Sequence, residues 1–520
     1  MKQDRLAAID IGTNSIRCIV VEVNKAGKYR VLDDEKTTVR LGEGLAAGGG
    51  VISGAAWQRT MDALCRMKKI VDGYGVVGIE TVATSAVRRA ANGDLFVKAV
   101  AENIGLQVTV ISGEDEAELT VASALNNFDM EGTRYGIVDI GGGSVEVITA
   151  LGNHIEEIYS LELGAVVLTE NFISTDPIKR GDYLRLRKHI RKTLKAAFPP
   201  EKMPLQCLLG SGGTMTSIAA MVIAMHKEGY GSVHGYEVLR FEVVHLLAML
   251  LRKDLKGRKS IPGLNPDRAD IIVAGVTVVD ELMQFFGANL LKINERGLRE
   301  GLILKALRKH NFLSADRKPR TWRESVLEFA RSCHYDEDHS VQVVKLALAI
   351  FDAVVSSFGF SEKERQILEA AALLHDVGYL ISYSGHHKHT YHLVRHADLF
   401  GFTPREREII AHVARYHRKA IPTKKHENFA QLSSQDKILV KRLGGILRLA
   451  DGLDRRRNSL VSSLECSLSP TTFMVKLKGR ADVSVELFGG NIKGDLFEAA
   501  FGRKLMLVAA PLSDSHRSTG

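Results

Sequence analysis

The stretch Ala8-Ile9-Asp10-Ile11-Gly12-Thr13-Asn14-Ser15 returns in outline at Ile137-Val138-Asp139-Ile140-Gly141-Gly142-Gly143-Ser144. Each copy is an apolar run that ends in Asp and continues into a glycine turn and a small hydroxyl residue; a second β-rich run follows. Asp10 and Asp139 lie 129 positions apart, which is about the length of one domain. The repeat therefore predicts an internally duplicated chain in which two similar hairpins face one site.

The residue types in the repeat are those that a phosphate and a divalent cation require. Glycine lets backbone N–H groups approach an anion, Ser and Thr add hydroxyl donors, and Asp holds a hydrated cation. One copy alone is typical of an ordinary hairpin turn, but the recurrence favours a site. A third glycine-rich loop, Gly210-Ser211-Gly212-Gly213-Thr214, precedes a predicted helix and adds donors and a favourable helix dipole. We therefore predict a phosphate and Mg²⁺ site.

Length and composition narrow the class of protein. A chain of 520 residues predicts three or four domains, and 45% apolar with 25% charged residues is typical of an ordinary soluble protein. The chain shows neither a membrane-spanning apolar run nor a signal-peptide pattern, so we expect a cytoplasmic protein. The five scattered cysteines indicate neither a disulfide framework nor a cysteine zinc site. A net charge of +9 favours a polyanionic partner, with nucleic acid, polyphosphate and phosphorylated nucleotides all open.

The periodicity of the apolar residues changes near residue 320. Strand-like and helix-like segments alternate from the first hairpin onward, which is an α/β pattern, and the second half repeats them. The polar stretch Ser314–Arg320 is the predicted linker, and helical spacing dominates residues 321–460. The last segment predicts a hairpin of residues 472–478 with residues 481–488, followed by a short helix.

Two further motifs complete the set: Ser112-Gly113-Glu114-Asp115-Glu116-Ala117 and Gly297-Leu298-Arg299-Glu300-Gly301. With the hairpins and the third glycine loop they resemble the exopolyphosphatase and guanosine pentaphosphate phosphatase (Ppx/GppA) family, a branch of the actin-like (ASKHA, ribonuclease H-like) ATPase superfamily. The resemblance extends to about residue 310. It implies two actin-like lobes, residues 1–128 with a return helix at about 297–311, and residues 129–296, with the active site in the cleft between them.

The resemblance also implies an activity and further parts of the chain. The activity is release of terminal orthophosphate from inorganic polyphosphate, or of the 5′ γ-phosphate from guanosine pentaphosphate, by Mg²⁺-assisted water attack. The long form of the family implies an all-α HD-type domain at residues 321–460 and a small α/β segment at residues 461–512. A homodimer is expected, and nucleic acid is not an expected partner.

Carried over position by position, the resemblance assigns roles to single residues. Glu116 is the expected catalytic carboxylate that orients or deprotonates the attacking water, and its acidic neighbours Glu114, Asp115 and Glu118 are expected to raise its pKa. Arg88 is the expected arginine on the transferred phosphoryl group. The expected Mg²⁺ ligands are Asp10, Asp139 and Glu146. The expected phosphate-binding residues are Thr13, Asn14, Ser15, Gly142, Gly143, Ser144, Gly210, Ser211, Gly212, Gly213 and Thr214.

The helical region carries a second candidate site, and twelve of the eighteen histidines lie at or beyond His334. A His, His-Asp, Asp series supplies four possible ligands: His339, His375, Asp376 and Asp451. The segment Leu373-Leu374-His375-Asp376-Val377-Gly378-Tyr379 resembles the core of HD-domain metal phosphohydrolases. Neutral imidazoles and carboxylates suit a divalent transition metal or Mg²⁺, so we predict a second divalent metal here. Weaker candidates for a further metal or a phosphate contact are His387, His412 and His417.

Three alternatives to an exopolyphosphatase stay open at this point. The same cleft would serve guanosine pentaphosphate as substrate, and the sequence does not separate the two. The cleft would also suit a sensor that binds polyphosphate or an alarmone while only the HD-type site hydrolyses. A sugar or acetate kinase of the same superfamily is the third alternative, but it requires an adenosine pocket for which the sequence has no sign beyond the third glycine loop.

Overall fold

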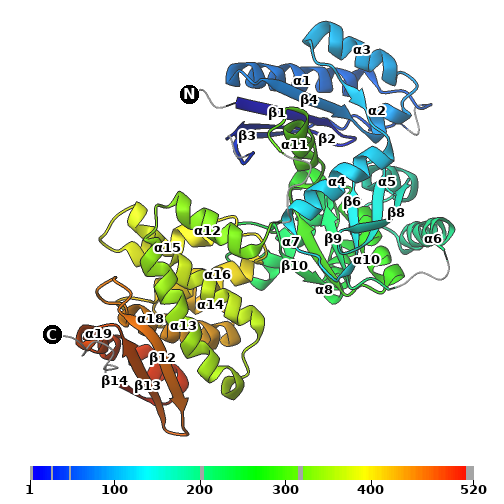
Figure 1. Ribbon diagram of the computed structural model, residues 1–520. Helices are drawn as coiled ribbons and strands as arrows, with labels where there is room; N and C mark the ends of the chain where they lie inside the picture. The colour runs from blue at the N-terminus through cyan, green and yellow to red at the C-terminus, as the bar shows by residue number, and fades with distance from the viewer. Residues whose placement is uncertain (1–3, 25–26, 46–48, 200–203, 314–319, 511–520) are drawn as a thin grey trace. The chain divides into compact units, whose positions relative to one another are not determined.

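The computed structural model describes residues 4–24, 27–45, 49–199, 204–313 and 320–510 (Figure 1). The chain forms two compact units. One unit comprises residues 1–228 and 232–319, and the other comprises residues 229–231 and 320–520. The predicted linker Ser314–Arg320 lies outside the described residues except for Arg320.

The first unit contains two sheets with the same topology. In each, three antiparallel strands are followed by two parallel ones with the first strand of each half between the two sets, and the second sheet has one further antiparallel strand at its edge. The first sheet has the order β3 (Tyr29–Thr38), β2 (Ser15–Val23), β1 (Asp4–Ile11), β4 (Gly78–Ala83) and β5 (Thr109–Val110). The second has the order β8 (His154–Leu161), β7 (Val145–Leu151), β6 (Arg134–Ile140), β9 (Cys207–Ser211), β11 (Leu290–Asn294) and β10 (Glu237–Leu239). The predicted duplication is thus present in the strand order.

Helices cover both faces of these sheets, which is why the central strands are apolar on both sides. Ala7 and Ile9 of β1 pack into one buried cluster with α1 and α3, whereas Leu6 and Ala8 pack into another with α11. Asp10 has the same parity as Ala8, so it lies on the α11 face.

The helices of the unit are α1 (Gly54–Tyr74), α2 (Ser85–Arg89), α3 (Gly93–Ile104), α4 (Gly113–Asn127), α5 (Ala165–Phe172), α6 (Arg180–Ala197), α7 (Gly213–His226), α8 (Arg240–Leu251), α9 (Leu255–Lys259), the 3₁₀ turn η1 (Pro266–Arg268), α10 (Ile272–Phe286) and α11 (Gly297–Lys309).

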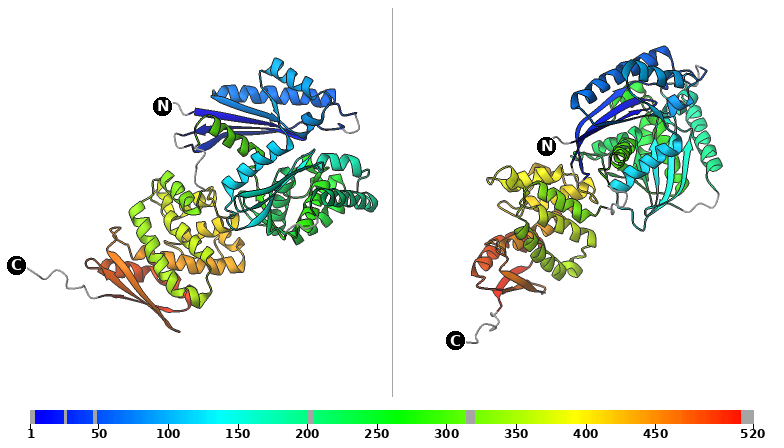
Figure 2. Two further views of the ribbon diagram at one scale, coloured as in Figure 1. Left: turned by 45° about the vertical axis from the view of Figure 1, so that its right-hand side comes forward. Right: turned by 45° about the horizontal axis from the view of Figure 1, so that its top comes forward.

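Helices α4 and α11 join the two halves of the unit by packing on each other's sheets. Ala117, Val121 and Ala124 of α4 lie in the apolar cluster of the second sheet, although α4 follows the first. Leu302 of α11, which follows the second sheet, lies in a cluster of the first. The two helices also pack directly against each other, as Figure 2 shows between the two sheets.

The second unit is mainly helical and has one continuous apolar core. Phe473 and Val475 of its small sheet belong to the same buried cluster as the long helices. Its elements are α12 (Trp322–Ser332), α13 (Glu337–Phe358), α14 (Glu362–Leu374), the 3₁₀ turn η2 (Val377–Leu380), α15 (His386–Arg395), α16 (Pro404–Arg415), α17 (Glu427–Gln431), α18 (Ser434–Gly452), β12 (Val461–Leu468), β13 (Thr472–Gly479), α19 (Ser484–Lys493), α20 (Asp495–Phe501) and β14 (Lys504–Ala509).

The predicted hairpin of residues 472–478 with residues 481–488 is wrong in its second strand. β13 pairs with β12 instead, and residues 484–493 form α19. Residues 481–488 alternate apolar and polar side chains, and this alternation suggested a strand. Their buried positions instead follow the period of a helix. This helix brings Gly489 against the backbone of Gly452. In β12, Leu464, Cys466 and Leu468 pack on the core at every second position, a signal that its serine-rich composition obscured.

Helix α13 (Glu337–Phe358) is the one helix within the described ranges that is long and apolar enough to cross a membrane. Val343, Ala347, Ile350 and Val354 of this helix belong to the buried cluster of the second unit. A helix of this length with one face in a core is typical of a globular domain, and we assign α13 as a core helix.

The close contact between α4 and α11 makes Gly301 sensitive to substitution. A Cβ at Gly301 would lie 2.1 Å from the carbonyl oxygen of Leu119, which is backbone and has no rotamer to change. We expect Gly301→Ala to lower the free energy of unfolding of the first unit by about 1–3 kcal/mol or more. Gly73 in α1 has open space around its Cβ position, so Gly73→Ala is the control and is expected to stabilise by at most ~1 kcal/mol. Calorimetry of the two variants tests this, and equal stability of Gly301→Ala and wild type would refute it.

Candidate active site

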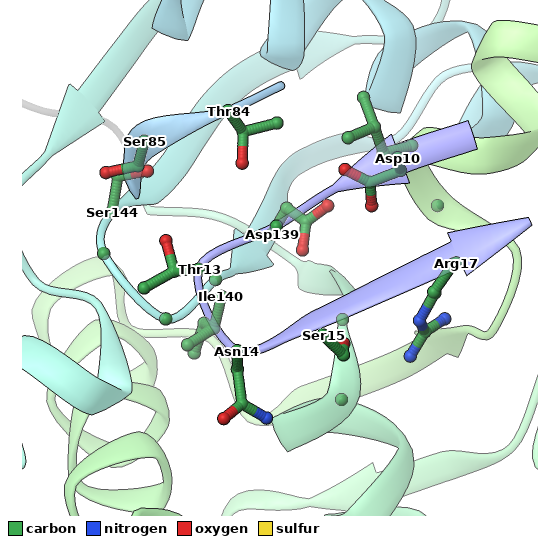
Figure 3. A pocket seen from close by; sticks show the side chains of 18 of the residues that line it. Asp10, Thr13, Asn14, Ser15, Arg17, Thr84, Ser85, Asp139, Ile140 and Ser144 are labelled. Carbon is green, nitrogen blue, oxygen red and sulfur yellow. The ribbon is translucent and has the colours of Figure 1, made fainter. Parts of the chain in front are cut away.

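The two hairpin turns have the same hydrogen bond at their base. The N–H of Gly12 donates to the carbonyl of Ser15 at 3.1 Å, and the N–H of Gly141 donates to that of Ser144 at 3.0 Å. Both turns line one pocket in the first unit, together with Gly212 and Gly213 of the third glycine loop. Figure 3 shows residues of both hairpins around this space. The structure therefore brings the three predicted glycine loops to one place.

The predicted phosphate-binding residues divide into those that line the pocket and those that do not. Lining residues are Thr13, Asn14, Ser15, Gly142, Gly143, Ser144, Gly212 and Gly213. Gly210, Ser211 and Thr214 are buried in β9 and α7 and are not among the lining residues, so their role in phosphate binding stays a prediction. Gly212 has φ 92°, and a side chain there would meet Oδ1 of Asp139 at 2.7 Å, so the loop requires glycine to pass the carboxylate.

Four carboxylates converge on the pocket. Asp10, Asp139 and Glu116 line it, while Glu146 lies opposite Asp139 in the β6–β7 ladder and is fully buried rather than lining. Burial raises the pKa of Asp10 and of Asp139 to about 6, and that of Glu146 to about 7. Ionisation of all of them in one buried place is unfavourable unless positive charge is present.

Glu116 belongs to the first turn of α4, and only it among the acidic residues there turns inward. Ser112 and Asp115 close a capping box in which the hydroxyl of Ser112 accepts from the N–H of Asp115 at 3.0 Å, and Glu114 is exposed. The pKa of Glu116 is raised well above its usual value by burial first, and then by Glu146, Asp139 and Asp10. The sequence analysis expected a raised pKa and attributed it to Glu114, Asp115 and Glu118, but these three side chains are exposed, and the cause is burial together with carboxylates from other elements.

Arg88 is close to Glu116 without lining the pocket. Its Nη1 lies 3.5 Å from Oε2 of Glu116 and donates to the carbonyl of Ile111 at 2.7 Å. The guanidinium therefore links α2, which carries Arg88, to Ile111 and Glu116 around the start of α4, and its role on the transferred phosphoryl group stays a prediction. Arg89 lies 3.8 Å from Glu162 and is partly exposed, as expected of a surface residue.

Four arginines that the sequence analysis did not assign also line the pocket: Arg17, Arg268, Arg296 and Arg299. Arg17 pairs with Asp10 across the β1–β2 ladder, at the position that corresponds to Glu146 opposite Asp139. The hairpin register would have identified Arg17, because cross-strand partners lie on the same face of a sheet. Burial lowers the pKa of Arg268 to about 10, and its Nη2 donates to the hydroxyl of Thr214 at 3.3 Å.

The carboxylates fit a divalent cation. Asp10 Oδ1, Glu116 Oε2 and Glu146 Oε2 are buried and have no hydrogen-bond partner in the part of the chain that the structure describes. Buried acceptor oxygens that have no donor are the ligand set of a hard cation such as Mg²⁺, which binds through one or two carboxylates and keeps several waters. These carboxylates therefore fit the predicted Mg²⁺. Asp10 and Asp139 line the pocket, and Glu146 is buried opposite Asp139.

The second unit brings its four predicted ligands together. Nε2 of His339 lies 3.4 Å from Oδ1 of Asp451, and Nε2 of His375 lies 3.5 Å from Oδ2 of Asp376 and 4.0 Å from Oδ1 of Asp451. His339, His375 and Asp376 form one group that could hold a metal ion. Helix α13 carries His339, α18 carries Asp451, and His375 and Asp376 lie between α14 and η2, so the site exists only in the folded unit.

Of the weaker histidine candidates, only His417 lies in the cluster. His386, which the sequence analysis did not single out, lies 3.3 Å from it through the two Nε2 atoms. His387 belongs to neither potential metal group found among the described residues, and Nε2 of His412 lies 3.3 Å from Glu408 instead. His386 and His387 are adjacent in α15, and the sequence alone does not show which of the two faces the core.

Comparison with known proteins gives the following matches. Residues 19–310 match the model of the Ppx/GppA phosphatase family, and residues 322–485 match Ppx/GppA phosphatase, domain III. The chain is 31% identical over 318 residues to "Exopolyphosphatase 2" of Mycobacterium tuberculosis, covering 58% of this chain and 99% of that protein. A solved Ppx/GppA family member of Aquifex aeolicus is 28% identical with a TM-score of 0.51, covering 59% of this chain and 99% of the other. An exopolyphosphatase structure from Cytophaga hutchinsonii is 27% identical with a TM-score of 0.55, covering 59% and 98%.

The buried carboxylates predict a stability that falls with rising pH when metal is absent. Asp10 and Asp139 have a pKa of about 6 in the folded protein against an ordinary value of 3.8, so the folded state holds their protons more tightly than the unfolded chain. Their stabilisation is present below about pH 4 and is lost between about pH 4 and pH 6, by about 3 kcal/mol for one such carboxyl.

Asp139→Asn should make this loss shallower because the amide does not ionise. Calorimetry in a chelating buffer from about pH 4 to pH 8 measures it, with exposed Asp129→Asn as the control. Excess Mg²⁺ should restore stability above pH 6 in wild type and less so in Asp139→Asn. An Asp139→Asn profile parallel to that of wild type would contradict the assignment.

Proposed function

Because the chain belongs to the Ppx/GppA phosphatase family, whose members are phosphoanhydride hydrolases, we propose that it releases terminal orthophosphate from inorganic polyphosphate in the pocket of the first unit. The observation that carries the proposal is the position of Glu116. Its carboxylate lies buried in a pocket that also contains Asp10, Asp139 and the two glycine turns. A carboxylate that can accept a proton thus lies beside a site for a phosphate group and a cation.

In the proposed reaction Glu116 is the general base. Its Oε2 has no hydrogen-bond donor within the described ranges, although Arg88 lies 3.5 Å away, so the oxygen is available to the attacking water. The high pKa that burial and the other carboxylates give it makes it a stronger base once it is ionised. Water attacks the terminal phosphorus, the proton passes to Glu116, and the shortened chain leaves with the bridging oxygen.

The phosphate groups are held by two kinds of donor. The glycine turns and the hydroxyls of Thr13 and Ser144 offer neutral donors, and Arg17, Arg268 and Arg299 offer charge. Figure 3 supports this division, with Arg17 on β2 and the hydroxyls of Thr13 and Ser144 on the turns. Guanidinium groups neutralise the charge that develops on the phosphoryl oxygens and on the leaving group.

Asp10 and Asp139, with Glu146 behind them, would hold Mg²⁺. When bound, the ion neutralises phosphate oxygens and the buried carboxylates together. Exopolyphosphatases of this family depend on divalent metal, and the choice of Mg²⁺ rests on the all-oxygen ligand set.

For the second unit we propose an HD-type domain with a divalent metal at His339, His375, Asp376 and Asp451. Its support is the match of residues 322–485 to domain III of the family and the close approach of the four side chains. We also expect a cytoplasmic homodimer. The five free cysteines support a reducing compartment.

The test is phosphate release with Mg²⁺ from long-chain polyphosphate and from guanosine pentaphosphate in parallel. Glu116→Gln should lower the rate by about 10²–10⁴ because the amide cannot accept the proton. Glu118→Gln, an exposed change on the same helix, is the matched control and should keep full activity. Polyphosphate is the substrate if its kcat/KM exceeds that of the nucleotide, and the reverse result selects the guanosine pentaphosphate phosphatase.

Asp376→Ala separates the two units in the same assay. It should leave hydrolysis in the pocket of the first unit intact, since it lies in the second unit. Full activity in Glu116→Gln together with loss in Asp376→Ala would replace the proposal by the alternative of a polyphosphate or alarmone sensor with catalysis only at the HD-type site.

A further inference from the structure

Helix α6 of the first unit carries a row of basic side chains away from the pocket. We call this row the α6 stripe; its members line one open hollow along the helix and are Leu184, Arg187, Lys188, Arg191, Lys192 and Lys195. The pocket of the candidate active site is lined by other residues. Figure 1 shows α6 on the outside of the first unit, and it packs on α10. We propose that the α6 stripe is a second binding site for inorganic polyphosphate, which holds the part of a long chain that extends beyond the pocket; the choice of ligand rests on the proposed function.

The spacing of the α6 stripe follows the turns of the helix. Its members recur three or four residues apart, so they lie on one side of α6. From Arg187 to Lys195 the row extends over about 12 Å of the helix axis. The other side of α6, with Leu186, Ile190 and Leu194, is buried in the core of the unit. This burial fixes the rotation of the helix and keeps the basic row in solvent as a straight line of charge.

The protein supplies little counter-charge to the five cations of the α6 stripe. Nε of Arg187 and Nε of Arg191 each lie 2.6 Å from the same carboxylate, that of Glu281 in α10, which is 2% exposed. The three lysines are exposed, and within the part of the chain that the structure describes they have no ion-pair partner. The two arginines therefore anchor the helix, and the lysines are available to a ligand.

The basic side chains of the α6 stripe repel one another. Cations stand at i and i+4, as Lys188 and Lys192 do, and like charges at this spacing destabilise a helix. The one acidic residue in α6, Asp182, does not relieve the repulsion, because it is buried and accepts from the hydroxyl of Ser174 at 2.8 Å. An ordinary solvated helix gains from alternating signs, so a row of one sign indicates an anionic ligand.

The surroundings of these cations favour a polyanion that has neither bases nor acyl chains. Single-stranded nucleic acid is held by aromatic rings on which bases stack. On α6, the guanidinium of Arg187 lies over the ring of Tyr183, 5.6 Å from its centroid, and the ring of His189 lies 4.8 Å from that of Phe172. A membrane-surface helix needs an exposed apolar face, whereas Leu184 is the one large apolar side chain that α6 exposes. A row of charge without stacking rings or an apolar face fits inorganic polyphosphate.

A second site changes how the chain length of the substrate affects binding. A long chain whose end lies in the pocket is held again at the α6 stripe, so its dissociation slows without any change in the chemistry at Glu116. A chain too short to extend beyond the pocket gains nothing. Because the second contact is between lysines and phosphates, it weakens steeply with salt through counterion release, by analogy with nucleic acids.

The test compares the binding of long-chain polyphosphate and of tripolyphosphate to the full chain by titration calorimetry. Glu116→Gln is present in every sample so that the ligand is not consumed. The variant combines Lys188→Gln, Lys192→Gln and Lys195→Gln and keeps the arginines, because they hold Glu281. We expect the Kd for the long chain to rise by about tenfold or more at about 0.1 M salt, and the Kd for tripolyphosphate to stay within about twofold. The dependence of log Kd on log salt should become shallower by about 2, at about 0.7 for each lost contact.

The control combines Arg66→Gln, Lys69→Gln and Lys98→Gln, which removes the same charge from exposed positions of α1 and α3 and should change neither Kd. Unchanged long-chain binding in the lysine variant would refute the second site, as would equal weakening in the control. Weaker binding of both ligands would place the effect in the pocket and would also refute it.

Two further outcomes bear on the ligand. A long chain that binds no more tightly than tripolyphosphate before the lysines are changed would overturn the inference. A single-stranded oligonucleotide that binds as tightly as polyphosphate through the same lysines would overturn the choice of polyphosphate. The proposed function fails on a different result, namely phosphate release that persists in Glu116→Gln, so the two failures are distinguishable.

Discussion

The close packing of α4 against α11 is the contact on which the pocket depends. Each helix belongs to one half of the duplicated unit and packs on the sheet of the other half, and Gly301 allows their backbones to meet. Glu300 fastens the contact, since its buried carboxylate accepts from Ser123 at 2.8 Å and from Tyr29 at 2.6 Å. Glu116 at the start of one helix and Arg299 at the start of the other are thereby fixed on one pocket.

The charges in this pocket explain what kind of ligand it fits. Burial raises the pKa of Asp10 and Asp139, and it lowers the pKa of Arg268. Acidic and basic side chains in the same pocket therefore both lack sufficient counter-charge, although Arg17 lies opposite Asp10 in the β1–β2 ladder. A cation alone would satisfy the acids and an anion alone the arginines. A metal phosphate brings both, and the stability given up to keep these groups buried is typical of a functional site.

The sequence predicted most of the first site because a repeat constrains two places at once. The duplicated halves and the glycine turns follow from the repeated motif, whereas the choice of Glu116 follows from the family resemblance. Arg268 was not predictable, because it follows a turn far along the chain and reaches the pocket only through tertiary packing. Strand β12 was missed because its serines obscured the alternation. His386 was missed because neighbours in a helix differ by about 100° in direction, and nothing local shows which of two histidines faces inward.

The two candidate sites offer different ligand atoms, so they suit different metal ions. The first presents carboxylate oxygens among phosphate donors, which suits a hard, hydrated ion that arrives with its substrate. The second presents imidazole nitrogens whose protons are fixed by backbone carbonyls, which suits ions that stay bound without substrate. Affinity for transition metals rises with imidazole ligation, so the same metal does not need to serve both.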